Sequence, residues 1–230
     1  MGLTLHYRLN VATTSSRVAR ELVEQLRDRA LSLPFETVGP LEMVESPKDR
    51  SPWDDDAPLL WLDSFEMLIR GEDCYDIPPR RGFAFFVDPG PGCETASFGL
   101  AEYPKTIALS VGRRARTGLS GWSWRTFCKT QYASNPRLGG FENFRRCHVS
   151  LVELLDAAAD LGFRINIRDE GNYAAHRDIA RLRREIGEWN ELVAGVVGHL
   201  KDSLSGEADA PITAFPNYEH LEAKGRSNVK

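Results

Sequence analysis

The chain has no long run of apolar residues, and this absence excludes one large class of proteins. A helix that spans a bilayer needs roughly 20 consecutive apolar residues, and no segment of the sequence is apolar over that length. The first residues, MGLTLHYRLNVATT, have no basic leader followed by an apolar core, so we expect no secretory signal. The sequence therefore predicts a protein that neither spans a membrane nor is secreted.

Cysteine is also scarce, and its spacing argues against metal and redox motifs. The four cysteines are Cys74, Cys93, Cys128 and Cys147, with no CxxC and no Cys/His pair at metal-ligand spacing. Reduced thiols are therefore expected, together with a cytoplasmic location, no metal and no cofactor.

The periodicity of the apolar residues predicts an α+β fold. Strands are expected at 3–11, 35–44, 82–87, 95–103, 106–111 and 164–168, and helices after Ser15 or Ser16 and over 141–161 and 174–204. Residues 124–132 are expected to form a short helix that ends before Asn135-Pro136, with a strand as the alternative. We expect a mixed or antiparallel sheet, with an N-terminal β-α-β unit and two C-terminal helices packed on it. Residues 1–204 would form a single domain, and residues 205–230 a polar, partly ordered tail.

The last predicted helix carries an apolar stripe that is long for a single sheet to cover. Its members follow each other at intervals of three and four residues, and they are Ile179, Leu182, Ile186, Trp189, Val193, Val196 and Leu200. The glycines of this helix would let another backbone approach closely. Residues 179–200 are therefore a candidate surface for a homodimer or a protein partner, with packing in the domain's own core as the alternative.

Charge is segregated along the chain. Residues 42–76 hold eleven acidic and three basic residues, a net of −8, whereas residues 105–146 hold nine basic residues and one acidic residue, a net of +8. Aromatic residues are interleaved with the cations of the second segment, as in sites for nucleotides and single-stranded nucleic acids. In the alternative interpretation, the two segments are neighbours in space and neutralise each other.

The basic segment supplies the candidate binding residues. The loop from Gly118 to Gly121 is expected to enter a helix, whose free backbone N–H groups would meet an anion. The candidate ligand-binding residues are Arg113, Arg114, Trp122, Trp124, Arg125, Lys129, Arg145, Arg146 and His148.

Three other groups of residues could carry chemistry, and each also has a structural interpretation. Cys128 with His148 could form a nucleophile and its base, although a buried thiol and a core imidazole are the usual occupants of such positions. Residues 169–176 hold two carboxylates and His176, which suit acid-base work or helix capping by Asn172. Residues 54–56 are three aspartates that could meet a cation, although a solvated loop is the ordinary interpretation.

These observations support two hypotheses of different kinds. The first is a non-catalytic cytoplasmic binding or adaptor protein that associates through its long C-terminal helix. The alternative is an enzyme or binding protein that acts on a phosphorylated, nucleotide or other anionic ligand at residues 113–146.

Overall fold

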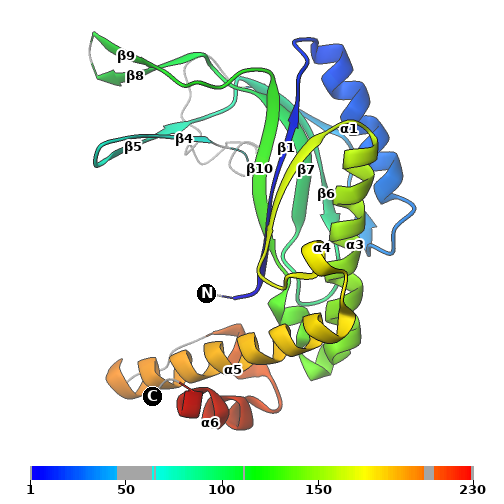
Figure 1. The fold of residues 1–230 in the computed structure, drawn as a ribbon, viewed down its shortest axis with the longest axis vertical. Helices are drawn as coiled ribbons and strands as arrows, with labels where there is room; N and C mark the ends of the chain where they lie inside the picture. The colour runs from blue at the N-terminus through cyan, green and yellow to red at the C-terminus, as the bar shows by residue number, and fades with distance from the viewer. Residues whose placement is uncertain (1, 46–63, 65, 111, 205–209, 229–230) are drawn as a thin grey trace.

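The computed structural model describes residues 2–45, 64, 66–110, 112–204 and 210–228, and these residues have the predicted α+β fold (Figure 1). The strands are β1 (Thr4–Val11), β2 (Thr37–Val38), β3 (Glu42–Glu45), β4 (Glu66–Arg70), β5 (Asp73–Ile77), β6 (Arg81–Asp88), β7 (Ala96–Glu102), β8 (Thr106–Ser110), β9 (Arg113–Arg116), β10 (Trp122–Lys129) and β11 (Arg164–Asp169). The α-helices are α1 (Ser16–Ala30), α3 (Gly140–Asp160), α4 (Tyr173–His176), α5 (Ile179–Leu204) and α6 (Tyr218–Asn228). The 3₁₀ helices are η1 (Gln131–Ser134), η2 (Pro136–Leu138) and η3 (Pro211–Ala214). None of the helices in these ranges has the length and apolar character needed to cross a membrane.

The main sheet is antiparallel throughout. Its strand order is β11-β1-β10-β7-β6-β2, and β3 also pairs with β6. The predicted hairpin is formed by β6 and β7. The predicted strand over 35–44 is divided into β2 and β3, because Pro40 between them has no N–H to donate to the ladder. The two strands of the N-terminal strand-helix-strand unit, β1 and β2, are not neighbours in the sheet. By the strand order given above, β10, β7 and β6 lie between them.

The prediction of a helix over 124–132 is wrong, because these residues form the end of β10 and the start of η1. Trp122, Trp124 and Cys128 are buried, whereas Arg125 and Phe127 are exposed. This alternation has the period of two that a half-buried strand requires. The loop that ends at Gly121 accordingly enters a strand, and it does not provide the free N–H groups of a helix N-terminus.

The helices α1 and α3 cover one face of the sheet (Figure 1). The side chain of Ser15 caps α1 by accepting a hydrogen bond from the backbone N–H of Val18, and Val23 and Leu26 are completely buried. Under these helices lies the core of the protein, which includes both tryptophans of β10. On the opposite face of β11, β1 and β10, Figure 1 shows no helix between α5 and the hairpins β4–β5 and β8–β9.

The predicted helix over 174–204 is interrupted. Arg177 adopts a left-handed conformation with φ 56° and separates α4 from α5. The chain's own C-terminal segment covers part of this helix: Val193, Ala194 and Val197 pack with Ile212, Phe215 and Leu221. Of the C-terminal half of the apolar stripe, Val193 is thus buried, whereas Val196 is half-buried and Leu200 is exposed. The backbones of α5 and α6 approach closely, since a Cβ added at Gly195 would lie 2.7 Å from the carbonyl carbon of Gly225.

Candidate ligand-binding groove

The residues predicted for an anion site do not meet in one place. Arg113 and Arg114 are exposed on β9, in a hairpin that projects from the sheet. Trp122 and Trp124 are each only 1% exposed and belong to the core. Successive side chains of a strand point to opposite faces. Arg125 therefore projects to the opposite face, on which the described residues form no covering helix.

The register of the sheet places basic and aromatic side chains together on this face. The central strand is β1, with β10 on one side and β11 on the other. Two rows of side chains run across these strands: Phe127, His6 and Arg168 form one row, and Arg125, Arg8 and Asn166 form the other. They line an open groove of about 1160 Å³, to which Met67, Glu94 and Thr95 also contribute. Pockets for small molecules commonly hold 300 to 1,000 Å³, so the groove has room for a longer ligand.

One carboxylate partly neutralises the arginines of the groove. Glu66 Oε1 accepts a hydrogen bond from Arg8 Nη2 at 2.6 Å, and Glu66 Oε2 lies 3.9 Å from Arg125 Nη1. Burial raises the pKa of Glu66, and the charges of the two arginines act in the opposite direction. The buried Nε of Arg8 has no hydrogen-bond acceptor in the described structure. The guanidinium groups therefore have more donors than Glu66 satisfies.

The other cations in and beside the groove differ in how far their charges are already paired. Lys129 Nζ lies 3.5 Å from Glu94 Oε1, and the Lys129 backbone N–H donates to Glu94 Oε2. Arg168, by contrast, forms no ion pair with any residue in the described part of the chain. Among the described residues, Arg125 is paired only with Glu66, at 3.9 Å, and its side chain is 51% exposed. Arg125 and Arg168 are therefore the cations most available to an anionic ligand.

An exposed ring lies on the same face as these cations, two residues from Arg125 on β10 and separated from Arg168 by His6. Phe127 is 52% exposed, which is unusual for a phenylalanine, and its centroid is 5.7 Å from that of His6. Flat rings flanked by cations allow bases to stack while the cations bind phosphates. The groove thus contains both an exposed ring on which a base can stack and cations that can bind phosphates.

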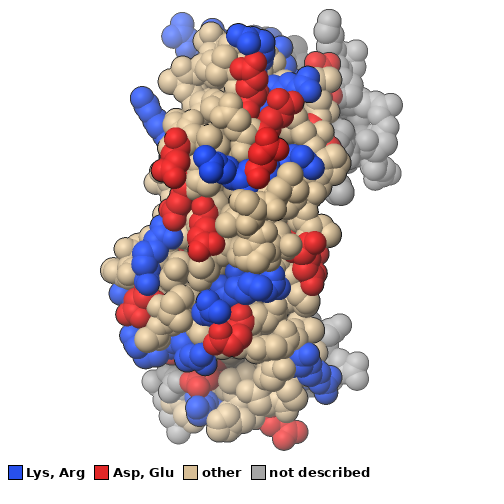
Figure 2. Space-filling model, turned by 90° about the vertical axis from the view of Figure 1, so that its right-hand side faces the viewer, with Lys and Arg blue, Asp and Glu red and all other residues tan. Residues whose placement is uncertain are grey.

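The face covered by helices has a different electrostatic character. Figure 2 shows Lys and Arg interspersed with Asp and Glu over this face. On α1, Arg17 pairs with Glu21 and Arg20 pairs with Glu24. This face therefore does not present a surface of one sign.

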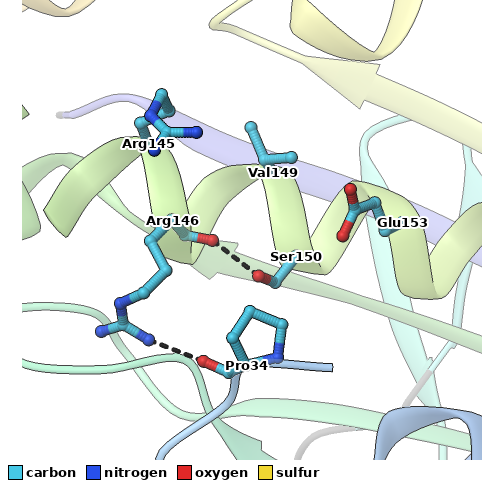
Figure 3. A pocket seen from close by; sticks show the side chains of 6 residues that line it. All are labelled: Pro34, Arg145, Arg146, Val149, Ser150 and Glu153. Carbon is cyan, nitrogen blue, oxygen red and sulfur yellow. Dashed lines mark hydrogen bonds between the residues drawn. The ribbon is translucent and has the colours of Figure 1, made fainter. Parts of the chain in front are cut away.

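Arg145 and Arg146 lie on α3, on the helical side, beside a small pocket of about 230 Å³ (Figure 3). Arg146 donates to the carbonyl oxygens of Pro34 and Pro89, and Arg145 donates to Glu142. The guanidinium donors are thus used to join α3 to two loops and to its own first turn. These two arginines have a structural role and do not extend the groove.

His148 is completely buried in a polar network. Its Nδ1 lies 3.0 Å from Thr130 Oγ1, and its Nε2 lies 3.2 Å from Asp169 Oδ1. Asp169 also accepts hydrogen bonds from the backbone N–H groups of Gly171 and Ala174. Burial raises the pKa of Asp169, but the His148 side chain and these N–H groups outweigh it, so this pKa lies below its ordinary value. The arrangement resembles a hydroxyl-imidazole-carboxylate relay, but it is closed to any substrate.

The predicted pairing of Cys128 with His148 does not form, because both ring nitrogens of His148 lie next to other groups. Cys128 Sγ instead donates to the Glu94 carbonyl oxygen at 3.1 Å, and burial raises the pKa of its thiol far above the ordinary value. Asp169, which the sequence grouped with His176, lies beside His148. Asn172 precedes α4 but makes no side-chain cap, and Asp169 takes the backbone N–H of Ala174.

Sequence reasoning missed the cations that β1 and β11 contribute, because Arg8 and Arg168 both lie outside the basic segment 105–146. A signal was nevertheless present. In residues 3–11 and in RINIR, apolar residues alternate with polar ones, which places His6, Arg8 and Arg168 on the faces opposite the core.

Part of the predicted acidic segment 42–76 lies outside the described residues, including the three aspartates at 54–56. One contact between the acidic and basic segments is described, that of Glu66 with Arg125. In the described part of the chain, no group of three or more His, Cys, Asp or Glu side chains could hold a metal ion.

No family model, no curated protein and no solved structure matches this chain.

Proposed function

We propose that this protein binds a phosphate-bearing ligand with a flat base, a nucleotide or a single-stranded nucleic acid, in the groove on the helix-free face of β11, β1 and β10. The observation that supports this most is the exposed Phe127 on the same face of the sheet as Arg125 and Arg168, two cations with little or no compensation from the described residues. The proposed site keeps Arg125 and Lys129 from the basic segment and adds Arg8 and Arg168.

The proposal is for binding and not for catalysis. The groups whose geometry best suits acid-base chemistry, the side chains of His148 and Asp169, are 0% and 3% exposed. Reduced thiols support a cytoplasmic location as part of the same proposal, since all four cysteines are free.

The test is a titration of the purified protein with a fluorescently labelled single-stranded oligonucleotide, with unlabelled ATP and inorganic phosphate as competitors. The oligonucleotide should bind, and the double variant Arg125→Ala/Arg168→Ala should bind at least tenfold more weakly. Competition by ATP would identify a nucleotide site, whereas competition by a second oligonucleotide alone would identify a longer strand. Equal binding by the parent protein and the double variant would exclude the groove.

Association through residues 179–200 is a second candidate with narrower support. Leu192 and Leu200 remain 38% and 46% exposed on α5, whereas α6 and η3 cover Val193 and Val197. A partner that docks on α5 would therefore contact mainly the exposed side chains of Leu192 and Leu200.

A further inference from the structure

The hairpin of β8 and β9 continues the main sheet beyond one end of the groove. β7 ends at Glu102 and leads into β8, and β9 leads into β10, which begins at Trp122. Glu102 and Trp122 are paired in the sheet, so they mark the last step of the β7–β10 ladder before the hairpin. The Thr117 backbone N–H donates to the Lys105 carbonyl oxygen and closes the root of the hairpin. The hairpin is therefore anchored directly on the strand that carries Arg125.

The side chains of the groove lead toward this hairpin. Beyond the row that contains Arg125, the register gives a further row on the same face, made of Ser123, Asn10 and Arg164. Two residues along a strand cover about 7 Å, so this row lies about 7 Å closer to the root of the hairpin. Arg164 is exposed and has no acidic partner in the described ranges. Unpaired positive charge therefore continues from the groove toward β9.

The strand β9 presents further cations. Arg113, Arg114 and Arg116 are exposed, and no acidic side chain in the described part of the chain pairs with them. Arg114 Nη2 donates to Thr106 Oγ1 at 3.0 Å, which uses one of the five donors of that guanidinium. Alternate residues of a strand share a face, so Arg114 and Arg116 project from the side opposite the buried Ala115. The hairpin thus offers a row of positive charges.

The neighbouring hairpin of β4 and β5 has the opposite charge. Residues 66–77 hold four acidic residues and one basic residue, a net of −3, whereas residues 106–116 hold three basic residues and no acidic residue, a net of +3. Both hairpins project on the side of the sheet that carries the groove, away from α1 and α3 (Figure 1). A polyanion that leaves this end of the groove is therefore repelled by one hairpin and attracted by the other.

We propose that the ligand of the groove is a single-stranded nucleic acid that continues past Arg164 onto the β8–β9 hairpin, where Arg114 and Arg116 bind its phosphates. This inference rests on the proposed function and narrows it, because one nucleotide is too short to contact Arg168 and the hairpin at once. The acidic hairpin β4–β5 directs the strand by repulsion, and the basic hairpin holds it by attraction.

The length of the path sets the length of strand that is needed. Six residues of β10, from Trp122 to Phe127, and the four residues of β9 lie along it. At about 3.3 Å for each strand residue, they cover up to about 33 Å. A stacked strand that advances about 3.4 Å per nucleotide needs about ten nucleotides for this distance, and a more extended strand needs fewer. A strand of about four stacked nucleotides therefore fits the groove alone, and one of about twelve also reaches the hairpin.

The experiment compares these two lengths of one labelled sequence and two matched double variants. Arg114→Gln/Arg116→Gln removes two charges from the hairpin, and Arg17→Gln/Arg20→Gln removes two from α1, on the opposite face. All four side chains are exposed or half-buried, and none lines the groove. Binding is followed by fluorescence anisotropy at several salt concentrations, with ATP as the mononucleotide competitor.

The parent should bind the longer strand about tenfold more tightly than the shorter one, and the hairpin variant should lose most of this gain. For the longer strand, the slope of log K against log salt concentration should fall in magnitude by about 1.4, since each of two lost phosphate contacts contributes about 0.7. The hairpin variant should bind the shorter strand as tightly as the parent, which also shows that it is folded. The α1 variant should match the parent at both lengths.

A further variant separates charge from structure. Arg114→Lys/Arg116→Lys keeps the positive charges, and lysine binds phosphate as a point charge, so this variant should bind the longer strand nearly as tightly as the parent. A loss as large as that of the glutamine variant would overturn the inference.

The remaining outcomes divide between the inference and the proposed function. If the hairpin variant binds the longer strand as tightly as the parent, while Arg125→Ala/Arg168→Ala weakens it, the inference fails and the groove remains. Competition by ATP at the affinity of the longer strand, an equal loss for both strands in the hairpin variant, or an equal loss in the α1 variant would also overturn the inference. If the parent binds neither strand, the proposed function fails together with the inference.

Discussion

At the scale of single residues, the network around His148 is a source of stability. The side chain of Asp169 is 3% exposed. It lies next to the imidazole and accepts hydrogen bonds from two backbone N–H groups. Asp169→Ala should lower the free energy of unfolding by about 3 kcal/mol, because it leaves buried polar groups without a partner. Asp156→Ala removes an exposed ion pair with Arg177. This variant should change the free energy of unfolding by about 0.5 kcal/mol or less. Urea unfolding of both variants measures the two effects, and equal losses would contradict this account.

The same carboxylate predicts a pH dependence with a definite sign. The pKa of Asp169 is lower in the folded protein than its ordinary value, which is about 3.9 in an unfolded chain. The stability that it contributes is therefore complete above about pH 4 and is lost as pH falls through the lowered folded pKa. The difference in unfolding free energy between the parent and Asp169→Asn should be constant near neutral pH and should shrink in acid. A difference that grew in acid would contradict a lowered pKa of Asp169 in the folded protein.

Phe127 distinguishes a ligand with a base from a simple anion. A base that stacks on an aromatic side chain contributes about 1 to 3 kcal/mol by alanine substitution. Phe127→Ala should therefore weaken binding of the labelled oligonucleotide about tenfold, whereas Phe127→Tyr should retain it. The affinity for inorganic phosphate should be the same in both variants as in the parent. If Phe127→Ala bound the oligonucleotide as tightly as the parent, base stacking would have no part in recognition.

At the scale of elements, the contact between α5 and α6 depends on glycine. A Cβ at Gly225 of α6 would overlap the carbonyl oxygen of Glu191 on α5, whereas a Cβ at Gly187, also on α5, would meet nothing within 4 Å. Gly225→Ala should thus destabilise the protein by about 1 to 3 kcal/mol through overpacking. Gly187→Ala should stabilise it by about 0.5 to 1 kcal/mol through helix propensity. Thermal unfolding of the two variants should shift the melting temperature in opposite directions, and a shared sign would refute the close approach.

Most elements that periodicity predicted begin and end within about one residue of the observed bounds, whereas β4, β5, β9 and α6 were not predicted. The alternating strands and the stripe of α3 were predicted from the chain, because their spacing reflects burial on one face. The helix predicted over 124–132 was wrong, since Arg125 and Lys129 share a face on a strand as well as on a helix. The site was only partly predicted for a related reason. Arg8 and Arg168 reach Arg125 through strand pairing, which the order of residues along the chain does not encode.

At the scale of the whole molecule, the C-terminal segment reduces the apolar surface of α5 that is open to another copy of the chain. Val193 is 5% exposed against η3 and α6, and Leu200 is 46% exposed. Val193→Glu should destabilise the monomer by several kcal/mol, because it buries a charge, and Leu200→Glu should leave stability nearly unchanged. Light scattering after size exclusion should give the same mass at low and high protein concentration. A mass that rises with concentration and returns to the monomer in Leu200→Glu would favour association through α5.

The central claim is that an anionic ligand binds on one face of the molecule, and the salt dependence of oligonucleotide binding tests it most directly. The double variants Arg125→Ala/Arg168→Ala and Arg17→Ala/Arg20→Ala remove the same charge from opposite faces, and neither disturbs the core. For a single strand, the slope of log K against log salt concentration falls by about 0.7 for each phosphate contact that is lost. The account predicts a smaller slope and weaker binding for the groove variant only, with the α1 variant matching the parent. Equal losses in both variants would show that binding follows net charge and would contradict the groove.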